Sequence, residues 1–346
     1  MAIYCLYTNA FIMTILHLLR SSGTGHSIET VFSDVRWGPF INKNFTVEPV
    51  TMPCISRDWQ SVWRNLRFAR QQQADVFHIT GDVHYLALAL PKSRTVLTIH
   101  DAIPLVRNRH RPLRYALFWL LWYYWPMRRA SIVTTVSEKS RQELLQRVGR
   151  VARKVVVVAN PVGSLFQYCP QPVNTRCPTL LHIGTAPHKN LTRLIQALDG
   201  FACRLIIVGP LTDSDKAELN HRRIVYENYV DLPQHQLLNL YKTCDLVSFV
   251  STYEGFGLPI LEAQAVGRPV LTSAISPLRE VAGMGAHFVD PTNIQDIRAG
   301  LERICGDVAY RETLVANGLV NVKKFTISQI ERYYAALYAS MGISDP

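Results

Sequence analysis

The chain has 346 residues, an apolar fraction of 48% and a formal net charge of +11 at pH 7, so an anionic partner is expected. Its length and composition suit two globular domains and exclude a largely disordered chain. Its 7 cysteines are scattered without a Cys-x-x-Cys pair, which favours buried thiols in a reducing compartment over a disulfide framework.

The N-terminal region predicts three short strands and one helix. Residues 3–7, 27–32 and 45–50 are expected to be the strands, and residues 12–20 the helix. The start of the chain lacks the basic lead and long apolar core of a signal peptide, and no segment reaches the roughly 18 apolar residues expected of a spanning helix. We therefore expect a cytoplasmic protein.

Two predicted strands further along the chain end in polar side chains. Residues 59–73 predict a helix with a basic face, and residues 75–79 and 96–99 are the predicted strands. Ligands of a parallel sheet bind beyond the carboxyl ends of its strands. A cleft at these strand ends is therefore expected to be lined by polar side chains, namely His78, Asp82, His84, His100 and Asp101.

Residues 115–127 carry no charge, contain Trp119, Trp122 and Trp125, and are flanked by arginines. The stretch is too short to span a bilayer. Two interpretations stay open: a helix at the inner face of an anionic membrane, or a helix partly buried between the sheet and its neighbours. Partial burial is favoured, with an exposed aromatic edge as the alternative. The basic clusters between residues 107 and 154 indicate an anionic partner of the first half, or simply a solvated face.

The second half begins after a predicted linker at residues 163–177, which is rich in Pro and Gln. Residues 179–183 predict a strand, and the turn from Gly184 to Lys189 leads into a predicted helix at 191–198. A glycine turn with a lysine at a helix start suits phosphate binding.

Residues 251–269 are the stretch around which the second half is organised. The apolar run 246–250 predicts a buried strand, and Gly255 and Gly257 allow a tight loop after it. Pro259 suits the first position of a following helix, where its missing N–H is not needed. A strand, a glycine loop and a helix N-terminus together form an anion site.

Two carboxylates flank this anion site, Glu254 in the loop and Glu262 about one turn into the helix. A diphosphate held by the loop amides would leave both carboxylates free for neutral hydroxyls on either side. That arrangement suits a nucleotide sugar, with ribose at one end and a hexose at the other. The glycines alone would be weak evidence, and a glutamate in a first helical turn is often only a partner of the helix dipole.

This stretch resembles the Glu-x7-Glu signature of the family 4 retaining glycosyltransferases, which have the GT-B fold. The steps His100-Asp101 and Lys189-Asn190 resemble further motifs of that family. Two features depart from its pattern. His188 stands where an arginine is usual, and the first predicted strand is not followed by the family's glycine-rich turn.

The resemblance implies roles for individual residues. Glu254 would meet hydroxyls of the donor sugar, Glu262 would hold the ribose, and Lys189 would stabilise the departing diphosphate. His100 would approach the sugar near the reacting carbon, so the implied catalytic residues are His100, Lys189 and Glu254. The implied donor-binding residues are Gly184, His188, Lys189, Asn190, Tyr229, Val230, Glu254, Gly255, Phe256, Gly257, Leu258 and Glu262. The acceptor-side candidates are Asp82, His84 and Asp101.

The resemblance also implies an α/β protein with two Rossmann-like doubly wound domains that face each other across a cleft. Residues 1–165 would form the acceptor-side domain, residues 166–325 the nucleotide-sugar domain, and residues 326–346 a helix that returns to the first domain.

The implied reaction moves a hexose, with retention of its anomeric configuration, from a nucleotide-diphosphate sugar to a glycan or lipid-linked acceptor. It would serve surface polysaccharide or glycolipid synthesis and need no metal or other cofactor. A non-catalytic nucleotide-sugar or anion-binding protein on the same scaffold is the alternative. Nucleic acid is not expected as a partner, because the sequence has no interleaved basic and aromatic recognition motif.

Overall fold

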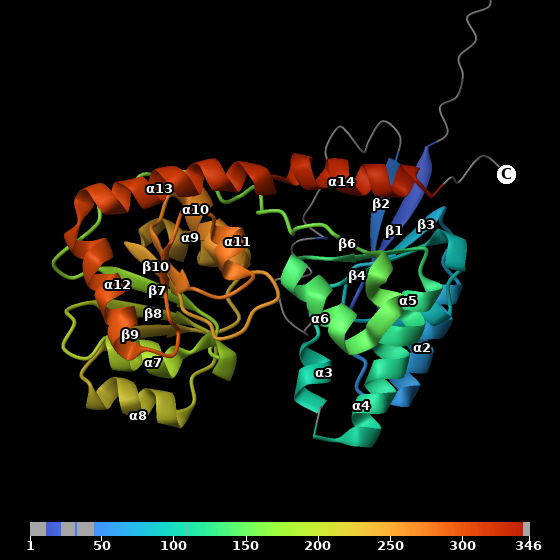
Figure 1. Cartoon of the computed structure of the whole chain (residues 1–346), viewed down its shortest axis with the longest axis horizontal. Helices are drawn as coiled ribbons and strands as arrows, with labels where there is room; N and C mark the ends of the chain where they lie inside the picture. The colour runs from blue at the N-terminus through green and yellow to red at the C-terminus, as the bar shows by residue number, and fades with distance from the viewer. Residues whose placement is uncertain (1–11, 22–31, 33–44, 109, 342–346) are drawn as a thin grey trace, which may run out of the picture. The chain divides into compact units, whose positions relative to one another are not determined.

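The computed structural model describes residues 12–21, 32, 45–108 and 110–341, shown as ribbons in Figure 1. The chain divides into two compact units. One unit combines Met1–Ala159 with Ile327–Pro346, and the other is Asn160–Thr326. The end of the chain thus belongs to the same unit as its beginning.

In the described part of the first unit, six parallel strands form one sheet in the order β2-β1-β3-β4-β5-β6. Their bounds are β1 (Met13–Leu19), β2 (Phe45–Thr51), β3 (Val76–Ile79), β4 (Thr95–Ile99), β5 (Ile132–Thr135) and β6 (Val155–Val157). The predicted strands at residues 3–7 and 27–32 lie outside the described residues, apart from Phe32. The other predicted strands of this unit are confirmed.

The predicted helix at residues 12–20 is wrong, because β1 occupies this stretch. β1 pairs with β2 on one side and with β3 on the other, and six of its seven residues are buried. A strand that is buried on both faces reads as a continuous apolar run, which periodicity cannot distinguish from a buried helix. Pairing with two neighbouring strands decides the conformation here.

Helices cover both faces of this first sheet. Along β3, Phe77 and Ile79 belong to the apolar cluster formed with the connecting helices, whereas His78 points to the opposite face and contacts α14 (Ile327–Ala339). The connecting elements are α2 (Trp59–Arg70), η1 (His84–Leu88), η2 (Lys92–Arg94), α3 (Ile103–Asn108), α4 (Pro112–Phe118), the π-helical η3 (Trp119–Tyr124), α5 (Trp125–Arg129), α6 (Glu138–Val148) and η4 (Gly149–Lys154). The predicted helix at 115–127 is therefore confirmed as the succession of α4, η3 and α5.

A row of polar side chains crosses the sheet beneath α14. The hydroxyl oxygen of Tyr338 lies 2.7 Å from Nδ1 of His78 and 3.2 Å from Nε2 of His17. Nε2 of His78 lies 2.7 Å from Oγ1 of Thr98, which is 2.7 Å from Oγ1 of Thr134. His78 is fully buried in this row, so the prediction that it lines a cleft is wrong. These hydrogen bonds hold the C-terminal helix against the first unit.

The second unit contains another all-parallel sheet, in the order β12-β11-β10-β7-β8-β9. Its strands are β7 (Thr179–Ile183), β8 (Arg204–Val208), β9 (Val225–Tyr229), β10 (Leu246–Phe249), β11 (Val270–Ser273) and β12 (His287–Val289). Two parallel sheets with helical crossovers confirm the predicted class of an α/β protein with two Rossmann-like units.

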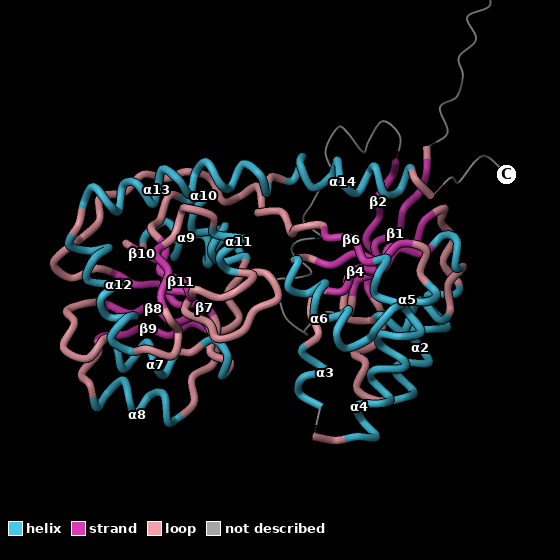
Figure 2. Tube along the Cα trace, in the orientation of Figure 1, coloured by secondary structure: helices cyan, strands magenta, loops and turns pink. Residues whose placement is uncertain are grey.

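Helices also lie on both faces of the second sheet (Figure 2). α7 (Leu191–Ala197) and α12 (Ile294–Gly306) share an apolar cluster with the strand residues Leu180 and Leu246. From β7 to β9 each new strand is added on one side of the sheet, whereas β10, β11 and β12 are added in succession on the other side. Right-handed crossovers therefore place α9, α10 and α11, which precede these three strands, on the face opposite α7. The remaining bounds are η5 (Pro187–Lys189), α8 (Asp213–His221), α9 (Gln234–Thr243), α10 (Leu258–Val266), α11 (Leu278–Ala282), α13 (Val308–Val322) and η6 (Lys323–Phe325).

Candidate functional site

The loop between β10 and α10 has the backbone shape that its glycines predict. Gly257 has a φ of +116°, and a Cβ there would come within 2.7 Å of Cδ2 of Leu278. Only glycine satisfies both conditions, so Gly257 sets the entry of the chain into α10. The helix starts at Leu258, which places Pro259 within its first turn. The helix ends at Gly267, whose φ of +82° is typical of a C-terminal glycine.

A second glycine turn follows β7. Gly184 has a φ of +91°, and a Cβ on it would come within 2.9 Å of Cγ and Cε of Lys189. The aliphatic part of Lys189 therefore lies across the bare backbone of Gly184. Its ammonium nitrogen lies 4.6 Å from the ring centroid of Phe249, at the end of β10.

The two turns meet through an ion pair. Nζ of Lys189 lies 2.7 Å from Oε1 of Glu254, and the two side chains are only 19% and 12% exposed. The structure thus brings together two of the three predicted catalytic side chains within one unit. In this shielded setting the lysine carries the positive charge that would attract a diphosphate, and the carboxylate keeps its other oxygen for hydroxyl groups.

The residues on either side of Lys189 hold the two turns together. The backbone N–H of Thr252 donates to the carbonyl oxygen of His188 at 2.8 Å. Asn190 has a φ of 64°, and its Nδ2 donates to the carbonyls of Val250 at 2.9 Å and Pro291 at 2.7 Å. The side-chain amide of Asn190 is therefore engaged by the protein, which makes it a positioning group for the lysine turn.

Glu262 lies on α10 and has a partner that the sequence does not reveal. The hydroxyl of Tyr241 on α9 donates to Oε2 of Glu262 at 2.5 Å. Burial raises the pKa of Glu262 to about 7, although the Tyr241 hydrogen bond acts in the opposite direction. Burial also raises the pKa of Tyr241 well above its ordinary value, so its hydroxyl keeps its proton. Tyr241 orients Glu262 and leaves Oε1 for a ligand.

Two of the predicted donor-binding residues, Tyr229 and Val230, lie at the end of β9 and directly after it. The carbonyl of Tyr229 accepts a hydrogen bond from the N–H of Gly209 at 2.8 Å, and its hydroxyl donates to Oε2 of Glu227 at 2.6 Å. Val230 follows with 48% of its surface exposed, and Asp231 turns the chain with a φ of 52°. The loop thus exposes an apolar side chain at Val230, and the two hydrogen bonds of Tyr229 fix its conformation.

In the first unit, His100 and Asp101 end β4 as predicted. Nε2 of His100 lies 2.7 Å from the carbonyl oxygen of Thr80, and the residue is 9% exposed. Oδ1 of Asp101 accepts from the N–H of Ile103 at 2.8 Å, where α3 begins. Burial raises the pKa of Asp101 above its ordinary value. The hydrogen bond to Thr80 fixes the ring orientation of His100.

The other two acceptor-side candidates differ in exposure. Nδ1 of His84 lies 2.9 Å from the carbonyl oxygen of Trp122, and burial lowers the pKa of His84 to about 4. The Asp82 side chain is 60% exposed, and its backbone carbonyl accepts from Nε1 of Trp122 at 3.0 Å. His84 is therefore a buried neutral group, and Trp122 ties this loop to η3.

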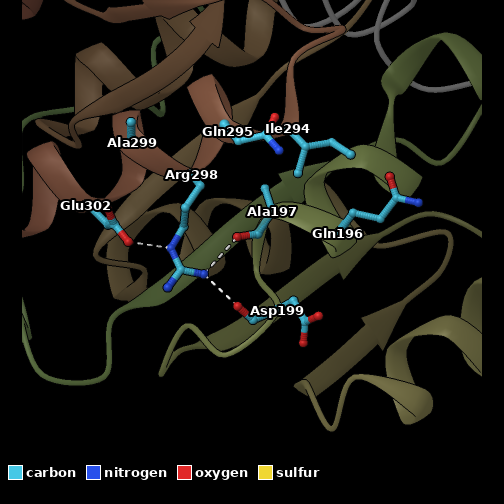
Figure 3. A pocket seen from close by; sticks show the side chains of 8 residues that line it. All are labelled: Gln196, Ala197, Asp199, Ile294, Gln295, Arg298, Ala299 and Glu302. Carbon is cyan, nitrogen blue, oxygen red and sulfur yellow. Dashed lines mark hydrogen bonds and ion pairs between the residues drawn. The ribbon is translucent and has the colours of Figure 1, made fainter.

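A shallow hollow of about 220 Å³ lies between α7 and α12 (Figure 3). The guanidinium group of Arg298 crosses it and donates to Oε1 of Glu302 at 2.6 Å and to the carbonyls of Ala197 and Asp199 at 3.1 and 2.7 Å. No predicted site residue lines this hollow. Its one cation is already bound by protein oxygens, so the hollow carries no ligand argument.

Two features are absent from the part of the chain that the structure describes. No three His, Cys, Asp or Glu side chains gather there in a group that could hold a metal ion. None of the helices described is both long and apolar enough to cross a bilayer.

Two family models match the chain. The model described as Glycosyltransferase Family 4 matches residues 17–163, and the model described as Glycosyl transferases group 1 matches residues 171–319. The first match falls almost wholly in the first structural unit, and the second falls within the second unit.

Curated relatives include polysaccharide enzymes. The chain is 29% identical over 258 residues to an O-antigen chain mannosyltransferase B of Escherichia coli, covering 67% of each protein. It is 27% identical over 261 residues to the serotype-specific mannosyltransferase WbdA of Escherichia coli, covering 67% of this chain and 32% of WbdA. The chain therefore spans only about a third of the length of WbdA.

A solved structure has the same overall fold. The crystal structure of Anabaena Alr3699/HepE in complex with UDP and glucose matches with a TM-score of 0.75 at 20% identity. The match covers 95% of this chain and 100% of that chain. At this level of identity the likeness establishes the fold alone.

Proposed function

Because this chain belongs to the family 4 glycosyltransferases of the GT-B fold, we propose that it transfers a hexose from a nucleotide-diphosphate sugar to an acceptor glycan or lipid-linked glycan. The observation that carries this proposal is the shielded Lys189–Glu254 ion pair between two glycine turns. The pair sits beside the N-terminus of α10, where backbone N–H groups attract anions.

The donor would bind along this loop. Its diphosphate would lie against the backbone amides at the start of α10 and form an ion pair with the ammonium group of Lys189. Glu262, oriented by Tyr241, would accept hydrogen bonds from the ribose hydroxyls. Glu254 would then accept from hydroxyls of the transferred sugar. These are charge-assisted hydrogen bonds, each worth about 1.5–3 kcal/mol.

Lys189 would act mainly in the chemical step. Negative charge grows on the diphosphate oxygen as the bond to the sugar breaks, and a fixed ammonium group stabilises that charge. Family membership also suggests a role for His100 at the transferred sugar, and the hydrogen bond to the carbonyl oxygen of Thr80 fixes the orientation of its ring. We propose retention of the anomeric configuration, which rests on family membership. NMR of the product would test it.

Mannose is the first donor sugar to test, since two of the relatives are O-antigen and serotype-specific mannosyltransferases. The experiment is a panel of UDP- and GDP-linked hexoses, read out by thermal stabilisation and by release of the free nucleoside diphosphate. Stabilisation together with release that depends on Lys189 supports transfer. Thermal stabilisation by a donor, without release of nucleoside diphosphate in the presence of any acceptor tested, would favour the alternative of a non-catalytic nucleotide-sugar-binding protein. Stabilisation by none of the donors would overturn the proposal.

We further propose that the acceptor is presented at an anionic membrane, as expected of a lipid-linked glycan. The basic composition of the first half supports this, because anionic lipids attract clustered arginines.

A further inference from the structure

An apolar stripe on the first unit faces solvent. Leu113 and Leu117 of α4 and Leu120 of η3 are 88%, 40% and 37% exposed. Their spacing of four and three residues places them along one side of the helix. Leucines on the outside of a helix at this spacing do not contribute to the core of the unit.

A second exposed stripe lies on α2. Trp59 and Trp63 are four residues apart and are 59% and 62% exposed. The guanidinium carbon of Arg67, a further four residues along, lies 5.9 Å from the Trp63 ring centroid. An aromatic ring beneath a guanidinium group suits the boundary between water and an apolar phase.

The two stripes belong to one face of the sheet. α2 packs on η1, and η1 packs on η3, which continues α4. α2, η1, α4 and η3 lie in the connections from β2 to β3, β3 to β4 and β4 to β5, and each of these connections leads to a strand further along the sheet in the same direction. Right-handed crossovers therefore place all of these elements on the face opposite α14. Figure 1 shows α2, α4 and α5 together on this unit.

The charge around the stripes is mainly positive, although the exposed Asp58 caps the N-terminus of α2 next to Trp59. Residues 59–74 and 102–137 contain no Asp or Glu. The helices that carry the stripes and the adjoining α5 also carry or adjoin exposed arginines, namely Arg64, Arg67, Arg70, Arg111, Arg114, Arg128 and Arg129. A surface that combines apolar side chains with predominantly positive charge is complementary to an anionic surface that also has an apolar layer.

Two of the three tryptophans between residues 115 and 127, Trp119 and Trp122, do not belong to the exposed surface. Nε1 of Trp119 donates to the carbonyl of Arg147 at 2.9 Å, and Nε1 of Trp122 donates to that of Asp82 at 3.0 Å. Both side chains pack partly buried against the core of the first unit. The outward groups are the leucines of α4 and η3, the tryptophans of α2, and Trp125 of α5, which is 41% exposed.

We propose that the exposed faces of α2 and α4 dock on an anionic phospholipid surface, with Leu113 and Leu117 entering the headgroup boundary and the arginines contacting lipid phosphates. This deepens the proposed function by naming the surface that would bring the protein to a lipid-linked acceptor. Leucine gains nothing from the phosphates of a nucleic acid, whereas its transfer from water to an apolar layer is favourable.

The test is co-sedimentation of the full chain with vesicles of neutral phosphatidylcholine or of phosphatidylcholine with about one third phosphatidylglycerol. We expect binding to the anionic vesicles, little binding to neutral vesicles, and release by salt. Leu113→Gln with Leu117→Gln should weaken binding by about tenfold or more. The matched control replaces the exposed Val308 and Val320 of the second unit by Gln and should leave binding unchanged.

Charge is tested separately by Arg64→Gln with Arg114→Gln, expected to weaken binding about fivefold for each arginine. Circular dichroism verifies that every variant is folded. Equal binding to both kinds of vesicle, no binding, or full binding by the double leucine variant would each overturn the docking surface. The measurement uses no donor or acceptor, so its failure leaves the proposed transfer standing, and failure of transfer leaves the docking result intact.

Discussion

The ammonium group of Lys189 lies 2.7 Å from the carboxylate of Glu254, although 65 residues separate them in the chain. Both side chains are largely shielded from water, so loss of either leaves the other as a poorly compensated charge. This pair joins the two glycine turns of the second unit, and the first prediction tests it.

Lys189→Ala is expected to lower the single-turnover rate at saturating donor by about 100- to 1000-fold, the loss typical of one preorganised charge at a reacting centre. The control is Lys216→Ala, which removes a lysine from an exposed ion pair in the same unit. The Lys216 side chain is 51% exposed, and its Nζ lies 3.6 Å from Oδ1 of the exposed Asp213. Lys216→Ala should retain the full rate. A Lys189 variant with an unchanged rate would show that this ammonium group does not act on the leaving diphosphate.

Gly184→Ala should reduce both stability and donor binding. Its φ of +91° is unfavourable for alanine by about 1–2 kcal/mol, and its new Cβ would displace the Lys189 side chain. Gly200→Ala is the matched control, since Gly200 has a φ of +66° with nothing within 4 Å of its Cβ position. Urea unfolding should detect a loss in both variants, whereas calorimetry with nucleotide should detect a loss only at Gly184. Equal nucleotide affinities would contradict this account of the turn.

Nucleotide affinity should fall as the pH drops below about 7. The pKa of Glu262 is raised to about 7 by burial, and the ionised carboxylate accepts stronger hydrogen bonds from the ribose hydroxyls than the protonated acid does. The fall should be at most tenfold per pH unit below that value and should level off at the affinity of the protonated form. Tyr241→Phe removes the hydrogen bond that lowers this pKa, so the midpoint should move to higher pH.

Glu262→Gln is the control for that titration. It should bind nucleotide more weakly at pH 8 and show little dependence on pH between 6 and 8. A pH profile that is the same in the wild type, Tyr241→Phe and Glu262→Gln would exclude Glu262 as the titrating group.

Acid should destabilise the protein through its buried histidines. Burial lowers the pKa of His17 to about 3 and that of His84 and His182 to about 4, from an ordinary value of 6.5. Because the unfolded chain binds these protons first, stability from each histidine is complete above pH 6.5 and declines as the pH falls toward the folded pKa. The slope is about 1.4 kcal/mol per pH unit for each histidine.

The measurement is urea unfolding at pH 7 and pH 5, compared with His182→Phe and with His235→Gln at an exposed position. His182→Phe should lose less stability than the wild type between the two pH values, whatever its stability at pH 7. His235→Gln should follow the wild type. An identical pH dependence in all three proteins would contradict the assignment to buried histidines.

Much of the fold could be predicted because its strands are short apolar runs bounded by turn residues. This pattern predicts β7 and β10, and the glycines predict the loop that leads into α10. The same reasoning fails at residues 12–20, where an apolar run is equally compatible with a buried helix. There the hydrogen bonds to β2 and β3 select a strand.

Partners that come from other elements could not be predicted. Tyr241 belongs to α9, and nothing in its local spacing marks it as the hydrogen-bond donor to Glu262. Trp122 likewise turns inward to bind the loop of Asp82 and His84, which leaves other side chains on the surface. Such contacts depend on which helices pack together.

The sequence by itself determined the two glycine turns, since Gly184 and Gly257 adopt backbone angles that other residues disfavour. Only the tertiary structure decided that these turns act as one site. β7 and β10 are adjacent parallel strands, so their carboxyl ends lie side by side at the same edge of the sheet. That adjacency brings Lys189, which follows β7, to Glu254, which follows β10.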